Sequence, residues 1–375
     1  MRHIPLSDID IGEEEIKSVV DVLKSKWLSM GPVTQEFERQ FADYLGIKHA
    51  FGVSNGTAAL HIANKVLGIG KGDEVILPSL TFVATANASL YCGAKPVFAD
   101  VKSLDNLNIS PEDILEKITP KTKAITVVHY AGYPCDMDAI MEIAEDYNLK
   151  VIEDAAHAPG AEFKGKKCGT IGDIGCFSFF ANKNLVTGEG GMVVTNDDSL
   201  AEKVKTIRSH SMTTLTWDRH KGHAFSYDVT DMGFNYRINE ISSAIGLAQL
   251  KKLDQNNEIR KRIVNDYKNG LNNLSDFSIP FKNHGEKSSF HIFPVILSDG
   301  LSRTDFMGKL REKGIQTSIH YPPVHLFTYY KKLGFRDKTL PKTEYLGKHL
   351  VTLPLHMKMS EEDVSYVINV LKGVI

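Results

Sequence analysis

A regular alternation of two kinds of segment limits the fold of this chain more than any other feature. From about residue 49 to residue 196, short apolar runs rich in Val, Ile and Phe alternate with longer stretches whose apolar residues recur at helical spacing. This pattern is typical of a largely parallel sheet with helices on both faces. We expect strands at residues 49–53, 74–77, 96–100, 124–128, 150–153, 175–179 and 192–195, and helices at 57–67, 83–91, 137–147 and 199–209. The sequence therefore predicts a large α/β domain over residues 1–250, built on a mostly parallel seven-stranded sheet.

The C-terminal third of the chain shows a different pattern. Residues 239–274 contain no proline and carry apolar residues mostly three or four positions apart, which predicts one long helix or two joined helices. We expect this segment to lead into a second domain. The elements expected after it are a strand at 290–297, a helix at 304–312, a strand near 316–320 and a closing helix at 361–371. They indicate a smaller α+β domain over residues 251–375.

Charge and composition exclude several classes of partner. The 44 basic and 46 acidic side chains leave a net charge of −2, and no long run of Lys or Arg offers a surface for nucleic acid or membrane. No stretch approaches the roughly 18 apolar residues of a membrane span, and acidic residues interrupt the N-terminal segment, so we expect a cytoplasmic protein. The four cysteines are scattered, which favours reduced thiols over a disulfide framework or a metal site.

The segment from Ser54 to Leu60 lies where an expected strand ends and a helix begins. Free backbone N–H groups and the positive end of the helix dipole make such a turn an anion site, and Gly56 lets the backbone approach an oxygen closely. A phosphate group fits this position. Ser, Asn and Gly before a helix are also ordinary capping residues, and this reading stays open for the segment taken alone.

A second segment places two acids and a histidine at the end of an apolar strand. Asp154 follows Glu153 at the carboxyl end of the expected strand, and His157 comes three residues later. A carboxylate there points into the crevice where open α/β sheets bind ligands, and a pyridinium N–H is one group that keeps it ionised. Asp154 as a helix cap and His157 as a structural residue are the alternatives.

The third segment contains a lysine between a buried aromatic strand and a glycine-rich turn. Apolar surroundings disfavour the ammonium form of Lys183 and lower its pKa, so that the amine can attack an aldehyde. Ser178, at the end of the same strand, is placed to offer its hydroxyl to a phosphate. A lysine after a strand is otherwise most often a surface side chain with its charge in water.

These segments occur together and in one order along the chain, and in that order they resemble a known family. The sequence is similar to the DegT/DnrJ/StrS group of nucleotide-sugar aminotransferases, which are fold-type I enzymes dependent on pyridoxal 5′-phosphate (PLP). The resemblance extends almost from end to end. The matching segments are residues 27–32, 54–57, 78–85, 153–157, 177–183, 188–191 and 233–237.

The resemblance implies a role for individual residues. Lys183 would hold PLP as a Schiff base, Asp154 would pair with its pyridine nitrogen, and Phe82 would stack on its ring. The phosphate would be bound by Thr57, by Ser178 and by the backbone of Gly56, Thr57 and Ala58. An Asn at the position of Asn235 reaches the phosphate across a two-fold interface in the family, which implies a homodimer with composite active sites.

The resemblance also implies the reaction. An amino donor, expected to be L-glutamate, would leave its amino group on the cofactor, and the keto group of a nucleotide-linked sugar would then receive it in ping-pong order. Enzymes of this group that aminate C4 often have His where this chain has His157, which favours a 4-keto sugar. Ser29, Met30, Glu189, His320 and Tyr321 are the expected substrate contacts. Residues 208–210 and 217–220 are candidates for binding the diphosphate or the donor carboxylate.

Other activities remain open at this point. A C3-keto sugar, a cyclitol ketone or an aminobenzoate-type reaction is compatible with the same residues. Related sugar dehydratases have His in place of the Schiff-base lysine, and Lys183 argues against that activity. A ligand-sensing regulator of the same fold would be expected to lose the lysine or the aspartate, or to carry a DNA-binding segment, and the chain shows none of these changes.

Overall fold

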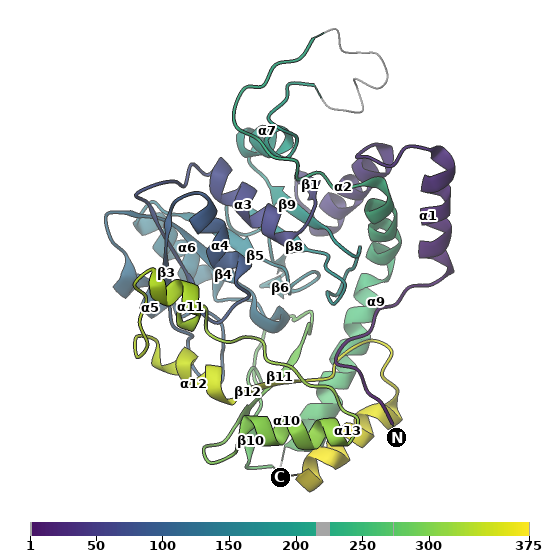
Figure 1. Ribbon diagram of the computed structural model, residues 1–375, viewed down its shortest axis with the longest axis vertical. Coiled ribbons are helices and arrows are strands. Elements are labelled where there is room, and N and C mark those ends of the chain that lie inside the picture. The colour runs from purple at the N-terminus through teal and green to yellow at the C-terminus, as the bar shows by residue number, and fades with distance from the viewer. Residues whose placement is uncertain (1, 215–225, 273, 375) are drawn as a thin grey trace.

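The large part of the protein is a seven-stranded sheet covered by helices on both faces (Figure 1). The computed structural model describes residues 2–214, 226–272 and 274–374. Within these residues the strand order is β1-β9-β8-β5-β4-β2-β3. Strand β9 is antiparallel to both of its neighbours, and the strands from β8 to β3 are parallel, so the predicted sheet is confirmed. The strands are β1 (His49–Val53), β2 (Glu74–Pro78), β3 (Lys95–Ala99), β4 (Thr122–Val128), β5 (Lys150–Asp154), β8 (Ile174–Ser178) and β9 (Gly191–Thr195).

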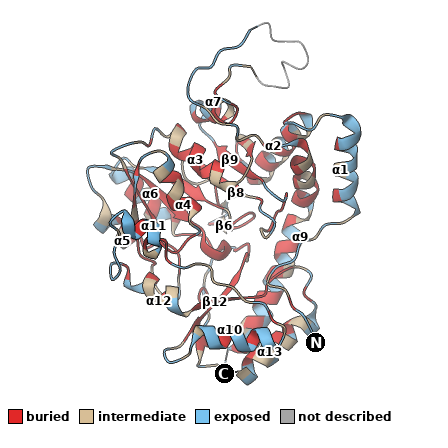
Figure 2. Ribbon diagram, in the orientation of Figure 1, coloured by how far each residue is buried: buried red, intermediate tan, exposed pale blue. Residues whose placement is uncertain are grey.

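Helices bury the apolar side chains of both sheet faces. Neighbouring residues of β2 show the alternation, because Val75 and Leu77 pack on one face while Ile76 packs on the other. The strands are accordingly buried along most of their length (Figure 2). One face carries α3 (Gly56–Val66), α4 (Ala84–Tyr91) and α7 (Asp198–Ile207). The other carries α2 (Pro32–Leu45), α5 (Pro111–Lys117), α6 (Met137–Asp146) and the first part of α9 (Glu240–Leu271).

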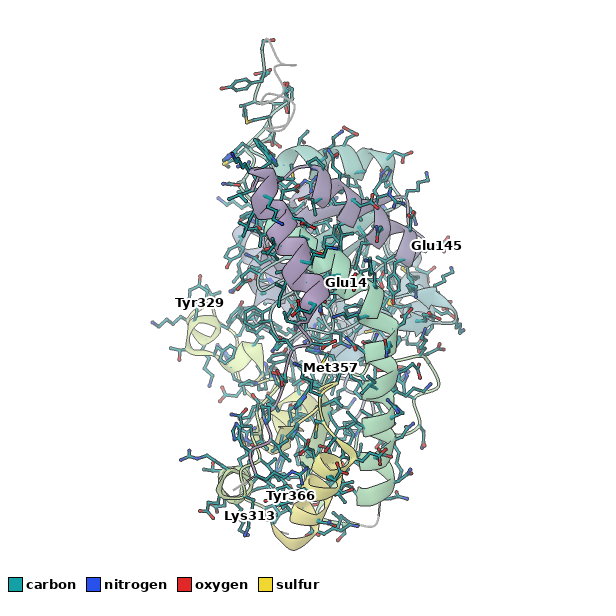
Figure 3. The ribbon with its side chains drawn as sticks, turned by 90° about the vertical axis from the view of Figure 1, so that its right-hand side faces the viewer. Glu14, Glu145, Lys313, Tyr329, Met357 and Tyr366 are labelled. Atoms are coloured by element: carbon teal, nitrogen blue, oxygen red, sulfur yellow. The ribbon has the colours of Figure 1, made fainter. Side chains whose placement is uncertain are left out.

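Helix α9 contributes to two hydrophobic cores. It begins after Asn239, whose side chain caps the first turn, and continues for 32 residues. Leu253 packs with the aromatic side chains of α2, whereas Tyr267 packs in a second core near the C-terminus. Helix α1 (Glu13–Ser25), which carries Glu14, lies against α9 (Figure 3). Glu14 forms an ion pair with Lys251 of α9. Of the two alternatives expected for residues 239–274, the structure shows one long helix. The division of the chain at residue 250 remains a prediction.

The second core surrounds a three-stranded antiparallel sheet. Its strands are β10 (Phe277–Ser278), β11 (Phe293–Leu297) and β12 (Leu350–Leu353), and it packs against α10 (Arg303–Glu312) and α13 (Glu361–Val374). The remaining elements are the hairpin of β6 (Glu162–Phe163) and β7 (Lys166–Lys167), the helices α11 (Thr328–Lys332) and α12 (Pro341–His349), and 3-10 turns at Tyr130–Gly132 and Val324–Leu326. None of the helices in the described ranges is both long and apolar enough to cross a membrane.

The expected strand near residues 316–320 is wrong. This segment makes an isolated bridge through Ser318 to Thr352 of β12, and β12 takes the place beside β11. After Ser318 the chain leaves the sheet and runs to the carboxyl end of β2, where the Val324 N–H donates to the Ser79 carbonyl oxygen at 2.9 Å. The departure brings His320 and Tyr321 to the edge of the large sheet, where a cavity lies.

Candidate active site

A cavity of about 450 Å³ lies at the carboxyl ends of the parallel strands and the N-terminus of α3. This is the edge at which open α/β sheets usually bind ligands. Ten of the residues expected from the sequence line it together: Gly56, Thr57, Phe82, Asp154, His157, Ser178, Lys183, Glu189, His320 and Tyr321. Further lining comes from residues that sequence reasoning did not assign, among them Asn55, Thr81, Thr85, Phe180 and Asn182.

The N-terminus of α3 forms a cradle for an anion. Asn55 caps the helix, and its Oδ1 atom accepts the Ala58 N–H at 2.8 Å. The Ala58 N–H is therefore already engaged, whereas the N–H groups of Gly56 and Thr57 lie in the first turn, where a helix offers no acceptor. A Cβ atom on Gly56 would approach the Cβ atom of Ser178 to 2.8 Å, so only glycine lets these two segments pack so closely. The first turn and the Ser178 hydroxyl thus border one space that fits a phosphate.

An aromatic ring and a buried carboxylate border the adjacent space. Phe82 is 56% exposed, and its ring lines the cavity 6.0 Å from the ring centroid of Tyr321. The Asp154 Oδ2 atom accepts the Thr85 hydroxyl at 2.8 Å, and its Oδ1 atom accepts the Ala156 N–H at 3.2 Å. Burial raises the pKa of Asp154, and the Thr85 hydrogen bond is the largest effect that opposes this rise. A positively charged N–H group in the cavity would stabilise this carboxylate.

Lys183 supplies an amine with unusual acidity. It follows β8 and lies half-buried in the wall of the cavity. Burial lowers the pKa of Lys183 to about 8, and the negative charge of Asp154 opposes this effect. Far more of this amine is neutral at physiological pH than for a lysine in water, and the neutral amine is the form that attacks an aldehyde.

Hydrogen bonds indicate the tautomer of His157. Its Nδ1 atom lies 3.3 Å from the Ala131 backbone nitrogen, whose N–H group can only donate, so the ring proton belongs on Nε2. The Nε2 atom lies 2.9 Å from the hydroxyl oxygen of Tyr321. Burial favours the neutral form of both side chains. It lowers the pKa of His157 well below its usual range and raises the pKa of Tyr321. The two residues form a neutral pair in which Tyr321 accepts from His157 and retains its own proton for another acceptor.

Other segments hold this wall of the cavity in place. His320 contacts the Thr352 hydroxyl through Nδ1 at 2.9 Å, and the Tyr130 hydroxyl donates to the His320 carbonyl oxygen. Burial lowers the pKa of His320 to about 4, which leaves its ring neutral. Next to Lys183 in the sequence, the amide group of Asn184 donates to Asn257 and to the Ser289 carbonyl oxygen and accepts from His291. Asn184 therefore anchors the backbone directly after Lys183.

Some expected site residues lie outside this cavity. Ser29 is exposed, and Met30 borders a separate small cavity beside Arg208. Asn235 is exposed and forms a backbone bridge with Ser209. Residues 217–220 lie outside the described residues. The sequence offers one hint of a role for Thr85, which is its position four residues after Thr81. Nothing in the sequence connects Thr85 to Asp154.

Comparison with known proteins decides the family. The model of the DegT/DnrJ/EryC1/StrS aminotransferase family matches residues 9–372. The chain belongs to this family. It is 39% identical over 380 residues to the spore coat polysaccharide biosynthesis protein SpsC of Bacillus subtilis, with 100% of this chain and 97% of SpsC covered. The predicted resemblance is thereby confirmed.

Solved structures agree with the DegT/DnrJ/EryC1/StrS assignment. PseC of Helicobacter pylori, an aminotransferase involved in the biosynthesis of pseudoaminic acid, is 30% identical with a TM-score of 0.92, covering 100% of this chain and 99% of PseC. The putative sugar aminotransferase Spr1654 of Streptococcus pneumoniae in its PLP form is 31% identical with a TM-score of 0.91, covering 100% of both chains. Spr1654 is also known in a pyridoxamine phosphate (PMP) form. The present protein is thus a PLP-dependent transaminase of fold type I.

The cavity offers what PLP requires. The first turn of α3 and Ser178 fit its phosphate, the exposed face of Phe82 fits its ring, and the buried carboxylate of Asp154 fits its protonated ring nitrogen. The amine of Lys183 lies in the same cavity. Each feature alone has a structural explanation, and their presence in one cavity of this volume matches the cofactor on which the family depends.

Proposed function

We propose that this transaminase moves the amino group of L-glutamate to the C4 keto group of a nucleotide-linked deoxy sugar. The observation that carries the proposal is one cavity that combines an anion cradle, a buried carboxylate and a lysine amine whose pKa is lowered to about 8. Membership in a family of sugar aminotransferases supports the sugar acceptor. The biosynthetic roles named for SpsC and PseC support a product destined for a polysaccharide or a related glycan.

In this proposal the cavity residues hold the cofactor in one orientation. The N–H groups of Gly56 and Thr57 and the Ser178 hydroxyl would bind the phosphate, Phe82 would cover one ring face, and Asp154 would keep the ring nitrogen protonated, since all of these residues line the cavity. Bound PLP supplies an electron sink that makes the C–H bond next to the transferred nitrogen acidic. Because the carboxylate of Asp154 is buried and accepts a hydrogen bond from Thr85, it keeps one orientation at the end of β5.

Lys183 moves protons in both half-reactions. As a neutral amine, its Nζ atom would accept the proton from the carbon that bears the transferred nitrogen. Its ammonium form would then give the proton to the carbon on the other side of that nitrogen. The glutamate-derived 2-oxo acid leaves before the sugar binds, which gives ping-pong kinetics. The side chain of Asn184 donates two hydrogen bonds and accepts one, and these three bonds anchor the backbone next to Lys183 and so restrict Lys183 to one region of the cavity.

His157 and Tyr321 are the residues proposed to select the C4 keto group. Because Tyr321 accepts from His157, its own hydroxyl proton is free to be donated to an oxygen of the sugar. Glu189 and His320 line the same cavity and are proposed as further sugar contacts. A histidine at position 157 supports C4 over C3 because 4-keto enzymes of the group often carry it.

A homodimer completes the proposed site. Asn235 is exposed and lies outside the cavity of its own chain, and Ser29 is exposed as well. In a two-fold dimer these two exposed residues are proposed to reach the active site of the second copy, with Asn235 at the phosphate and Ser29 at the sugar. Met30, next to Ser29, is buried in its own chain, and its expected contact with the sugar stays a prediction. Size-exclusion chromatography with light scattering tests this part separately from catalysis.

An absorbance titration tests the catalytic proposal. The purified protein with PLP is expected to show a band near ~420 nm, and L-glutamate is expected to shift it to ~330 nm as the cofactor accepts the amino group. Lys183→Ala should lack the first band, whereas Lys166→Ala, which changes an exposed lysine, should retain it. A 4-keto-6-deoxy sugar nucleotide should then restore the first band. Restoration only by a 3-keto sugar or a cyclitol ketone would refute the C4 assignment, and absence of any band would refute the catalytic role of Lys183.

A further inference from the structure

Two buried threonines connect the start of α4 to the carboxylate of Asp154. The hydroxyl groups of Thr81 and Thr85 lie 2.9 Å apart, and the Thr85 oxygen lies 2.8 Å from Asp154 Oδ2. Thr81 and Thr85 are 2% and 1% exposed. Thr85 lies on α4 and Asp154 on β5, 69 residues apart in sequence, so their contact is a product of the fold.

The Thr85 hydroxyl has one proton and three neighbours that could share it. Asp154 Oδ2 at 2.8 Å and the Phe82 carbonyl oxygen at 3.2 Å can only accept, while the Thr81 hydroxyl can donate or accept. A charged acceptor at the shorter distance forms the stronger bond, so the Thr85 proton belongs to Asp154. Thr81 then donates to the Thr85 oxygen, and the chain of hydrogen bonds ends on the carboxylate.

This chain fixes both the charge and the orientation of the carboxylate. Asp154 Oδ1 is held by the Ala156 N–H, and Oδ2 is held by Thr85, so rotation about the carboxylate axis would break one bond or the other. Each oxygen keeps a lone pair for a ligand, because the group also lines the cavity. If Asp154 were protonated, the Thr85 proton would be free to turn to the Phe82 carbonyl oxygen.

We propose that Thr85, supported by Thr81, is a positioning residue that keeps Asp154 ionised and correctly oriented for the ring nitrogen of PLP. The inference rests on the proposed function, because it requires that Asp154 contact the cofactor. Thr85 acts through the carboxylate and needs no contact of its own with PLP. Its contribution should therefore disappear when the carboxylate is removed.

A double-mutant cycle on the dissociation constant of PLP tests this dependence. Binding of PLP to the apoenzyme is measured by absorbance for the wild type, Thr85→Val, Asp154→Asn and the double variant. Since hydrogen bonds to charged groups are among the stronger ones, Thr85→Val should weaken PLP binding about tenfold. In the Asp154→Asn background the same substitution should change it by less than about twofold, because the charged acceptor is gone.

Conservative variants separate hydrogen bonding from packing. Thr85→Ser retains the hydroxyl and should restore binding to within about twofold of the wild type, whereas Thr81→Val should weaken it about threefold by removing the support for Thr85. Thr126→Val is the matched control, because Thr126 is equally buried on β4 and, among the described residues, its hydroxyl has no hydrogen-bond partner. This control should bind PLP as the wild type does.

The outcomes distinguish the inference from the function on which it rests. Equal weakening by Thr85→Val in both backgrounds would overturn the inference, because Thr85 would then act independently of Asp154. Weakening by Asp154→Asn without any effect of Thr85→Val would overturn it as well, while leaving the proposed site intact. Unchanged binding in Asp154→Asn would instead refute the role of Asp154. If Thr85→Val does not fold, Thr85→Cys replaces it, since a thiol is a weaker donor of similar size.

Discussion

The Nε2 atom of His157 lies 2.9 Å from the hydroxyl oxygen of Tyr321, and this contact joins two distant parts of the chain. His157 follows β5 of the large sheet, whereas Tyr321 belongs to the segment that leaves the neighbourhood of β12 after Ser318. The two rings are nearly parallel, with an interplanar angle of 23°. Since the Ala131 N–H fixes the tautomer of His157, the contact has a defined direction and stabilises the closed wall of the cavity.

Tyr321→Phe is expected to leave the His157 Nε2–H without its acceptor. A buried donor left unpaired costs about 1–3 kcal/mol, so the free energy of unfolding should fall by that amount. The rate of amino transfer to the sugar should fall as well, because the phenolic proton is lost. Urea unfolding and steady-state kinetics measure the two effects. Tyr329→Phe is the control, since the side chain of Tyr329 is exposed on α11 (Figure 3). Equal unfolding midpoints for Tyr321→Phe and the wild type would contradict this hydrogen bond.

The lowered pKa of Lys183 predicts a pH profile for its reactivity. With a pKa of about 8, the neutral fraction should rise tenfold per pH unit below pH 8 and level off above it. A lysine in water, with a pKa of about 10.4, would continue to gain reactivity well beyond that point. Labelling of the apoenzyme by an amine-acylating reagent, followed by mass spectrometry of the Lys183 peptide, gives the profile.

Asp154→Asn tests the direction in which the charge of Asp154 shifts the pKa of Lys183. The Asp154 carboxylate stabilises the ammonium form and so raises the pKa of Lys183 against the effect of burial. Without that charge the midpoint of Lys183 labelling should move to lower pH. A midpoint that stays in place or moves to higher pH would show that Asp154 has no electrostatic influence on the amine.

The sequence was sufficient to predict the strands because their apolar runs are short, buried and separated by amphipathic helices. The strand expected near residues 316–320 failed because the competing run at Leu350–Leu353 pairs with β11 instead. An isolated segment cannot show which of two extended runs will find a partner in the sheet. That choice depends on contacts across more than 50 residues of chain.

The sequence predicted those residues of the candidate site whose side chain performs the chemistry itself. Lys183 and Asp154 stand out because a lysine or an aspartate directly after a buried strand is chemically distinctive. Thr85 and Asn184 do not stand out, because their importance lies in partners far away in the sequence, such as Asp154 for Thr85 and His291 for Asn184. A threonine or an asparagine acquires such a role only when the fold supplies its partner.

Two glycine substitutions should have opposite effects on stability. In Gly56→Ala the new Cβ atom would meet the Ser178 Cβ atom at 2.8 Å, so the first turn of α3 must shift, and both stability and PLP affinity should decrease. Gly308 lies exposed within α10, where an added Cβ atom would have no neighbour within 4 Å and the backbone is not left-handed. Gly308→Ala should raise the free energy of unfolding by about 0.5–1 kcal/mol. Thermal unfolding with and without PLP compares the two variants, and an unimpaired Gly56→Ala would contradict the close packing of the cradle.

Glu153 predicts how the protein responds to acid. Its side chain is fully buried next to Asp154, and its two oxygens accept from His129 Nε2 at 2.9 Å and from the N–H groups of Gly169, Ile171 and Gly172 at 2.6–2.7 Å. Burial raises the pKa of Glu153, but these donors outweigh it, and the net result is a lowered pKa. A carboxyl group whose pKa is lowered by folding stabilises the folded state at any pH above its pKa in the unfolded chain, which is about 4.3. This stabilisation is lost as the pH falls through the pKa of the group in the folded state.

Glu153→Gln should therefore be most harmful near neutral pH. The amide NH₂ group would face backbone N–H donors that need an acceptor, and the charge would be lost, so the free energy of unfolding should fall by about 3 kcal/mol at pH 7. The difference from the wild type should narrow as the pH falls from about 4.3, the pKa of an unfolded Glu, through the lowered pKa of the folded carboxyl group. Urea unfolding at pH 7 and at acidic pH measures both values. Glu142→Gln, on the exposed side of α6, should have little effect at either pH. A Glu153→Gln variant as stable as the wild type at pH 7 would show that the buried carboxylate contributes no net stability, and that its desolvation cancels the four hydrogen bonds that it accepts.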